Sequence, residues 1–164
     1  MPEDGRRYES FAGVLTMTPS PNGRHQLAVV RLCRLLEDAA PANLRVLPAP
    51  YDWWISEIEW YEPDVVVFHR DDFDPGGPLR ATPLLVVEVA SPSTRLHDLN
   101  AKFAAYAANG CPHYFVVDPD EPSVVAFRLA GRIYEEVARM VGDERFCVSE
   151  PFAVDFSPSE LVAD

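Results

Sequence analysis

The chain has 164 residues, of which 48% are hydrophobic, and carries a formal net charge of -12 from 26 acidic and 14 basic side chains. This size and apolar content suit one domain, residues 1–164, with a buried core. No stretch approaches the roughly 18 apolar residues of a membrane helix. The charged start "MPEDGRRYES" also lacks the apolar segment of a signal peptide. We therefore expect no membrane association.

Cysteine usage and charge narrow the class of protein further. Cys33, Cys111 and Cys147 are far apart and form no CxxC pair, which argues against structural zinc and against a disulfide framework. The expectation is a reduced, cytoplasmic protein. General nucleic-acid binders are normally basic, so a DNA or RNA partner of this acidic chain would require a local basic face or a bound metal ion.

The N-terminal part of the chain predicts a β-hairpin followed by a helix. "YESFAGVLTMTP" contains two strand-like runs around Ala12-Gly13. From His25 to Ala39 the apolar residues recur at helical spacing. Asn22 is a suitable N-cap for this helix, and Pro41 follows its end.

The rest of the chain predicts strands around one further helix. The strands are expected at 44–47, 51–56 (an edge strand, because of Pro48 and Pro50), 64–70, 84–90, 113–118, 123–129 and 133–140. Between the buried strands 64–70 and 84–90 lies a loop, 71–83, long enough to be a functional candidate. A second helix is expected at 97–109, and a short C-terminal helix at "SPSEL" with Ser157 as N-cap and Glu160 as its capping-box partner.

The order of these elements predicts a mixed α/β (α+β) fold. A helix between two buried strands implies a parallel crossover connection. The shorter connections elsewhere favour antiparallel neighbours. We therefore expect a mixed sheet that is covered by helices.

Two strands carry carboxylates that suggest a shared site. Asp64 follows Pro63 at the start of "DVVVF", and Glu88 lies inside the otherwise apolar "LLVVEVA". If these strands pair, the carboxylates meet at one end of the sheet, where they repel each other and burial is costly. A Mg²⁺ or Mn²⁺ ion would compensate both charges, with the backbone carbonyl of Val89 as a further oxygen ligand. In the alternative, Glu88 caps the strand or pairs with an arginine such as Arg95.

The second predicted helix offers a cation for the same site. Asp98, Lys102 and Tyr106 are four residues apart and form a column along the flank of its apolar stripe. From there the long side chain of Lys102 could reach the site with its amine. In the alternative, Asp98 and Lys102 form an exposed ion pair that contributes about a few tenths of a kcal/mol.

Taken in order, these residues resemble the Uma-two family of endonucleases, part of the PD-(D/E)xK, restriction-endonuclease-like superfamily. The segments "EPD", "VVEVASPST" and "YFVVDP" carry the resemblance most specifically, and it extends from "YESFAG" to the hairpins after "VVDPDEP". It implies a restriction-endonuclease-like fold, with a central mixed β-sheet flanked by helices and with N-terminal and C-terminal β-hairpins. It also implies hydrolysis of phosphodiester bonds in DNA.

The resemblance further implies roles for three residues. The superfamily pattern has a lysine two residues after the glutamate, where this chain has Ala90. Lys102 matches the position on the following helix to which this lysine is thought to have moved in the Uma-two family. Asp64 and Glu88 are then the Mg²⁺ ligands, and Lys102 lies near the attacking water or the phosphate.

In one respect the chain departs from the family pattern. The family often has a glutamate directly after the glycine of the N-terminal hairpin, whereas here Val14 follows Gly13. Glu9 and His25 are candidates to occupy its neighbourhood. This difference bears on the number of metal ions bound and on activity itself.

Three functions are open at this point. The first is a Mg²⁺-dependent endonuclease acting on DNA, with a homodimer favoured if both strands are cut. The second is a non-catalytic interaction module, and the third is a hydrolase of a smaller phosphate ester. The presence of Asp64, Glu88 and Lys102 together favours the first. The aromatic segment 51–61 could stack on unpaired bases or belong to the core or a dimer interface.

Overall fold

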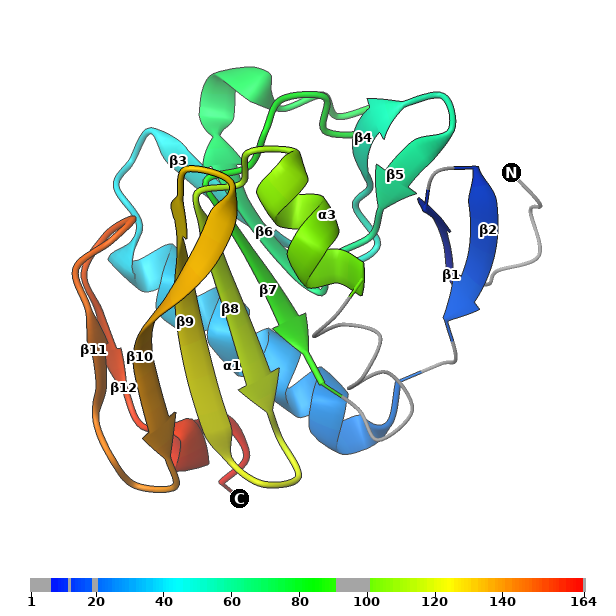
Figure 1. Ribbon diagram of the computed structural model, residues 1–164. Helices are drawn as coiled ribbons and strands as arrows, with labels where there is room; N and C mark the ends of the chain where they lie inside the picture. Colours follow the sequence, from blue (N-terminus) through cyan, green and yellow to red (C-terminus); the bar gives the residue numbers. More distant parts are fainter. Residues whose placement is uncertain (1–6, 12, 19–20, 91–100, 164) are drawn as a thin grey trace.

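The computed structural model describes residues 7–11, 13–18, 21–90 and 101–163. A six-stranded sheet forms the centre of the molecule, with α1 (Gly23–Ala39) on one face and α3 (Phe103–Ala108) on the other (Figure 1). A four-stranded sheet with the N-terminal hairpin lies on one side, and a C-terminal hairpin lies on the other. The predicted central mixed sheet with flanking helices and hairpins is confirmed.

The central sheet has the strand order β10-β9-β8-β7-β6-β3. Its strands are β3 (Leu44–Pro48), β6 (Val65–His69), β7 (Leu85–Val89), β8 (His113–Asp118), β9 (Ser123–Ala130) and β10 (Ile133–Val141). Only β7 and β8 are parallel among these neighbours. The chain passes from β7 to β8 by way of α3, which is the crossover that a helix between two buried strands predicts.

Apolar side chains bury both faces of this sheet. The β-branched residues of β6, β7 and β8 suit strands that are covered on both sides. One face packs against the apolar stripe of α1, where Leu32 and Leu36 are fully buried. The other face packs against α3 through aromatic residues, among them Tyr106 and Tyr114. Apolar layers therefore cover both faces of β6 and β7, and a polar side chain at the end of either of these two strands lies next to these layers.

The four-stranded sheet brings the N-terminal hairpin to the central sheet. Its order is β2-β1-β5-β4, and its strands are β1 (Arg7–Phe11), β2 (Val14–Thr18), β4 (Trp53–Ser56) and β5 (Glu59–Tyr61). Ser10 of β1 pairs with Trp60 of β5, and its hydroxyl donates to the Ile58 carbonyl at 2.7 Å. This attachment places Glu9, the residue before Ser10, close to the chain that leads into β6.

The two longer helices lie where the sequence predicts them, although their bounds differ from the predicted ones. Asn22 caps α1 as predicted, because its side chain accepts a hydrogen bond from the His25 amide at 2.9 Å. The second helix is seen as α3, which ends at Ala108 with Asn109 as its C-cap, and Gly110 follows with a left-handed φ of 77°. The start of the predicted helix, 97–100, lies outside the described residues. No helix in the described ranges has the length and apolar character to cross a membrane.

The structure corrects the predicted C-terminal helix and adds a strand, β5, that the sequence did not predict. The C-terminal helix is a single 3-10 turn, η3 (Pro158–Leu161). The Ser157 side chain does not cap it but donates to the carboxylate of Glu160 at 3.1 Å. The sequence pattern also missed β5, because a strand of three residues is too short to show alternation. A further 3-10 turn, η1 (Arg70–Asp72), and the hairpin of β11 (Phe146–Val148) and β12 (Val154–Phe156) complete the described elements.

The central strands carry the stability of the fold. Leu85 of β7 is fully buried, whereas Leu15 of the N-terminal hairpin is 50% exposed. We predict that Leu85→Ala lowers the free energy of unfolding by about 2–5 kcal/mol, because it removes apolar contacts and leaves a cavity. Leu15→Ala should cost less than about 1 kcal/mol. Urea unfolding of both variants checks this, and similar losses would contradict the assignment of the core.

Candidate functional site

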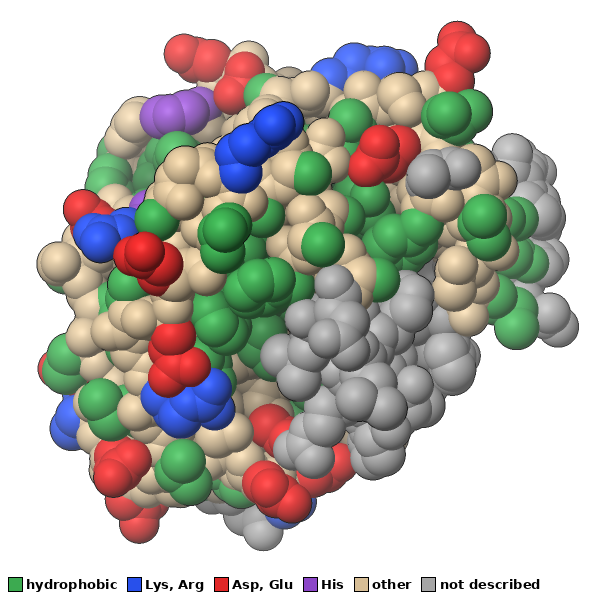
Figure 2. All heavy atoms as spheres, in the orientation of Figure 1, with side chains coloured by type: hydrophobic (Ala, Val, Ile, Leu, Met, Phe, Trp, Pro, Cys, Tyr) green, Lys and Arg blue, Asp and Glu red, His purple; other side chains and the backbone are tan. Residues whose placement is uncertain are grey.

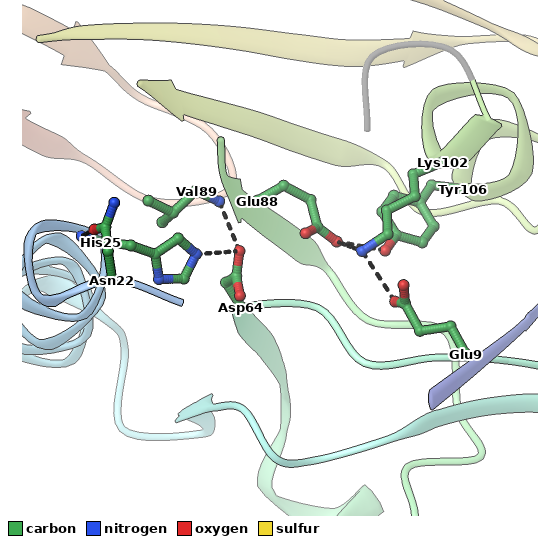
Figure 3. Close-up of polar contacts among 8 residues, drawn as sticks. All are labelled: Glu9, Asn22, His25, Asp64, Glu88, Val89, Lys102 and Tyr106. Atoms are coloured by element: carbon green, nitrogen blue, oxygen red, sulfur yellow. Dashed lines mark hydrogen bonds and ion pairs between the residues drawn. The ribbon is translucent and has the colours of Figure 1, made fainter. Parts of the chain in front are cut away.

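Asp64 and Glu88 lie at the same end of neighbouring strands (Figure 3). β6 and β7 are antiparallel, with Val65 opposite Val87. Continuing this register by one residue brings Asp64 opposite Glu88. The strand pairing on which the predicted site depends is therefore observed, and both carboxylates are buried. The two side chains have different partners, because Asp64 contacts His25 of α1 whereas Glu88 contacts Lys102 and Tyr106 on the α3 side.

Glu88 is bound by two side chains from the helical segment that follows β7. Its Oε1 accepts hydrogen bonds from Lys102 Nζ at 2.9 Å and from the Tyr106 hydroxyl at 2.6 Å. Burial, and then the charges of Glu88 and Glu9, raise the pKa of Tyr106 well above its ordinary value. Its hydroxyl therefore stays protonated and donates to the carboxylate. Arg95, the alternative partner of Glu88, lies outside the described residues.

Aromatic packing holds the Tyr106 side chain in this position. The ring of Tyr106 contacts those of Trp53, Tyr61 and Tyr114, with centroid distances between 5.3 and 5.7 Å. Tilted and edge-to-face pairs at such distances are favourable. Trp53 and Tyr61 of the aromatic segment 51–61 therefore belong to the core and support the Tyr106 side chain that binds Glu88.

Lys102 joins the N-terminal hairpin to this cluster. Its ammonium group lies 2.9 Å from Glu9 Oε1 as well as 2.9 Å from Glu88 Oε1 (Figure 3). Glu9 Oε1 also accepts the backbone N–H of Glu62 at 2.9 Å. Lys102 is only 4% exposed, so the interpretation of this side chain as part of an exposed ion pair is wrong. Asp98, the other member of that pair, lies outside the described residues.

Asp64 is bound from the other side by β7 and by α1. Its Oδ2 accepts the backbone N–H of Val89 at 2.9 Å and lies 3.2 Å from His25 Nε2. Because the carboxylate can only accept in its charged form, Nε2 carries the proton of this contact. His25 reaches Asp64 because the cap at Asn22 begins α1 beside the end of β6. His25 Nδ1 is buried and has no hydrogen-bond partner among the described residues.

Among the described residues, the site contains three buried carboxylates and only two basic groups. Glu9, Asp64 and Glu88 meet one ammonium group and one imidazole, and these five residues are each 5% exposed or less. Counted over these residues, negative charge exceeds positive charge when His25 is neutral. Burial of charge is costly unless it is compensated, so a cation added to this region would be stabilised.

Two of these carboxylates fit a hard divalent cation. Magnesium in proteins is commonly bound by one or two carboxylates, with water and substrate phosphate completing an octahedron. Asp64 and Glu88 satisfy that pattern in residue type, and they lie at the same end of neighbouring strands. Within the described part of the chain, no three His, Cys, Asp or Glu side chains are arranged as a metal cluster. The fit therefore rests on two protein carboxylates rather than on an all-protein cage.

The sequence identified several residues of this site but not all of the contacts that they make. It named Asp64, Glu88, Lys102 and Tyr106, and the structure brings the last three into direct contact. Val89 was expected to contribute its carbonyl, but the contact that it makes is through its N–H. Because N–H and C=O of one residue point to the same side of a strand, that carbonyl also faces the Asp64 side.

Glu9 and His25 were only accessory candidates, and both belong to the site. No local pattern could identify them, since Glu9 reaches Lys102 from another sheet and His25 reaches Asp64 from another layer. Val14, which occupies the family's glutamate position, is 67% exposed at the start of β2. A carboxylate at position 14 would therefore start in solvent, whereas Glu9 is buried.

Comparisons with known proteins show the family and the fold of the chain. The model of the Uma2 family, described as "Putative restriction endonuclease", matches residues 1–161. A crystal structure from Anabaena variabilis, of "a putative nuclease belonging to DUF820", superposes with a TM-score of 0.79 at 18% sequence identity. The alignment covers 99% of this chain and 93% of that chain. At this identity the likeness shows a shared fold. No curated protein matches the chain.

The buried position of Lys102 has a measurable consequence. We predict that Lys102→Met, measured without divalent ions, lowers the free energy of unfolding by about 3–5 kcal/mol, because two buried carboxylates lose a shared partner. Arg139→Met is the matched control, since Arg139 pairs with Glu136 at 2.7 Å while both side chains are about half exposed. That control should lose no more than about 1 kcal/mol. Equal losses in denaturant titrations would contradict the central position of Lys102.

Proposed function

The chain belongs to the Uma2 family, and we propose that it is a divalent-metal-dependent endonuclease that hydrolyses phosphodiester bonds in DNA. Asp64 and Glu88 are the proposed ligands of Mg²⁺ or Mn²⁺, with the Val89 carbonyl as a further candidate. Lys102 is the proposed cationic catalytic residue. One observation carries the proposal: the buried ammonium of Lys102 lies 2.9 Å from Glu88, at the end of the sheet where Val65, next to Asp64, pairs with Val87, next to Glu88.

Each residue has a distinct task in this mechanism. A bound divalent ion supplies a water of lowered pKa and stabilises negative charge on the phosphate. Lys102, next to Glu88, is placed to orient the attacking water or to add positive charge beside the phosphate. Tyr106 donates to Glu88 and fixes the direction of its carboxylate. These groups are held before substrate arrives, so little reorganisation is needed.

The overall charge supports a role for the metal in binding. Figure 2 shows acidic side chains at the upper and the lower rim of the face that carries α3, with fewer basic side chains among them. A chain with a net charge of -12 repels a polyanion. Affinity for DNA should therefore improve with divalent ions and fall with monovalent salt. Arg24 and Arg34, exposed on α1, are candidate phosphate contacts on that helix.

Glu9 and His25 are proposed as positioning residues. Glu9 shares the Lys102 ammonium with Glu88 and so keeps it beside the site. His25 and the Val89 amide both donate to Asp64 Oδ2. Two donors on one oxygen restrict the rotation of the carboxylate. Both residues act through the proposed ligands and cation.

The nuclease proposal predicts cleavage that depends on the three central residues. Purified protein should nick supercoiled plasmid with Mg²⁺ or Mn²⁺ and lose this activity in EDTA. Asp64→Asn, Glu88→Gln and Lys102→Ala should each lower the rate on the order of 100-fold or more. Glu37→Gln, an exposed carboxylate on α1, is the control and should keep the rate. Wild-type protein that cleaves no DNA or RNA with either metal would defeat the proposal.

The proposed task of His25 predicts an effect on metal binding. His25→Ala should weaken Mn²⁺ binding about 10–100-fold, because a group that orients a ligand is lost. His25→Gln should restore much of the affinity, since its amide N–H can replace Nε2–H as donor to Asp64. Calorimetric titration with Mn²⁺ measures both. Unchanged affinity in His25→Ala would show that the contact is structural only.

A second candidate function is a non-catalytic interaction module with a nuclease fold. The observation that favours it is the position of Lys102, whose ammonium partly neutralises Glu9 and Glu88 without a metal. Calorimetry decides between the two, because the module requires no divalent ion. The homodimer and the cytoplasmic location expected from the sequence stay predictions, the first of which size-exclusion chromatography with light scattering can test.

A further inference from the structure

The strand β2 forms one edge of the four-stranded sheet and lies at the periphery of the molecule (Figure 1). It pairs with β1 on one side, in an unbroken antiparallel register from Val14 to Thr18. Among the described residues no strand pairs with its other side. In an antiparallel strand every second residue directs its N–H and C=O groups away from the neighbouring strand. The outer edge of β2 therefore presents backbone donors and acceptors that can pair with a further strand.

The other edges of the two larger sheets are each protected against such pairing. The register of β10 is interrupted by a bulge between Glu136 and Ala138. β3 ends at Pro48, which has no N–H to donate. The edge of β4 is covered by the loop that follows η1, because the Trp54 N–H donates to the Leu79 carbonyl at 2.8 Å. Bulges, prolines and covering segments are devices with which proteins prevent pairing at sheet edges.

The side chains of β2 offer no such protection. Its sequence, "VLTMT", contains no charged residue and no proline. Val14, Leu15 and Met17 are each at least 50% exposed. Since the whole chain has a net charge of -12, an uncharged strand is a place where two copies can approach each other with little repulsion. An exposed apolar edge of this kind is a template for pairing with another chain.

We infer that β2 pairs with β2 of a second copy of this chain, in an antiparallel register centred on Thr16. In this register Leu15 lies opposite Met17 of the second copy, and the two Thr16 residues lie opposite each other. Directly opposite residues share a face of the sheet and are close enough for side-chain contact. The apolar pair forms twice, once on either side of the two-fold axis. The strand is therefore self-complementary, as the interface of a homodimer requires.

This interface lies next to the proposed cleavage site, and its functional meaning rests on that proposal. Glu9, which lies 2.9 Å from Lys102, is the residue of β1 opposite Thr16. With Thr16 on the two-fold axis, the Glu9 backbones of the two copies are three strand spacings apart, about 14 Å. The axis of an antiparallel pair is perpendicular to the sheet, so both Glu9 side chains lie on the same face. Both cleavage sites then face one substrate, a duplex that is cut on both strands.

Size-exclusion chromatography with light scattering, without metal or DNA, tests the interface. The full chain should form a dimer whose fraction rises with protein concentration. Leu15→Lys should raise the dissociation constant about tenfold or more, because it places a charge on the edge. Adding Met17→Glu to Leu15→Lys should recover much of the dimer, since the lysine at position 15 then lies opposite the glutamate of the second copy. Ile133→Lys is the control, an exposed apolar position on the edge strand β10, and should leave the dimer unchanged.

A disulfide tests the register. In Thr16→Cys the two new thiols lie at the two-fold axis, with a Cα–Cα distance of about 4.5–5.5 Å that fits a disulfide. Mild oxidation should therefore give a covalent dimer on a non-reducing gel. The experiment uses a Cys147→Ser background, because Cys147 is exposed. Ile133→Cys in the same background should give much less covalent dimer.

Two results would overturn the inference. A chain that stays monomeric at every concentration would leave the edge of β2 to an extended segment of another protein. A dimer that keeps its affinity in Leu15→Lys and forms no disulfide in Thr16→Cys would have its interface elsewhere. Because neither measurement involves metal or cleavage, failure here leaves the proposed nuclease function standing, and loss of that function leaves this result standing.

Discussion

The ammonium group of Lys102, buried between Glu9 and Glu88, is the interaction on which the rest of the site depends. It connects three parts of the chain that are far apart in sequence: the N-terminal hairpin, β7 and the helical segment before α3. Desolvating an ion costs several kcal/mol, and the partners recover that cost only when their geometry is good. A packing in which Lys102 missed either carboxylate would leave buried charge unpaired, so this contact restricts how the two sheets and α3 can be arranged.

The apolar layers make such a polar cluster possible. Valine-rich strands between α1 and α3 exclude water from the end of β6 and β7, and the aromatic group around Tyr106 closes the other side. Within this enclosure, electrostatic contacts are stronger than they would be in water. The same enclosure makes the excess of carboxylates costly. A divalent cation that meets Asp64 and Glu88 would relieve that cost, which is how a metal-binding role and the fold support each other.

Much of the fold follows from local patterns in the sequence, while the site follows from them only in part. The valine-rich strands, the capped α1 and the crossover through α3 were predictable because period, caps and connection length are local properties. Asp64, Glu88 and Lys102 were found because each interrupts or borders such a pattern. Glu9 and His25 could not be assigned in the same way, since their contacts to Lys102 and Asp64 span 93 and 39 residues of sequence, respectively. β5 was missed because three residues carry no period.

A crystal structure with Mn²⁺ tests the central claim most directly, because anomalous scattering locates the ion without reference to activity. The account predicts an anomalous peak with carboxylate oxygens of both Asp64 and Glu88 at about 2.0–2.3 Å, and with Lys102 still beside the site. A fully substituted soak that shows no peak at these two carboxylates, with Lys102 unmoved between Glu9 and Glu88, would contradict it.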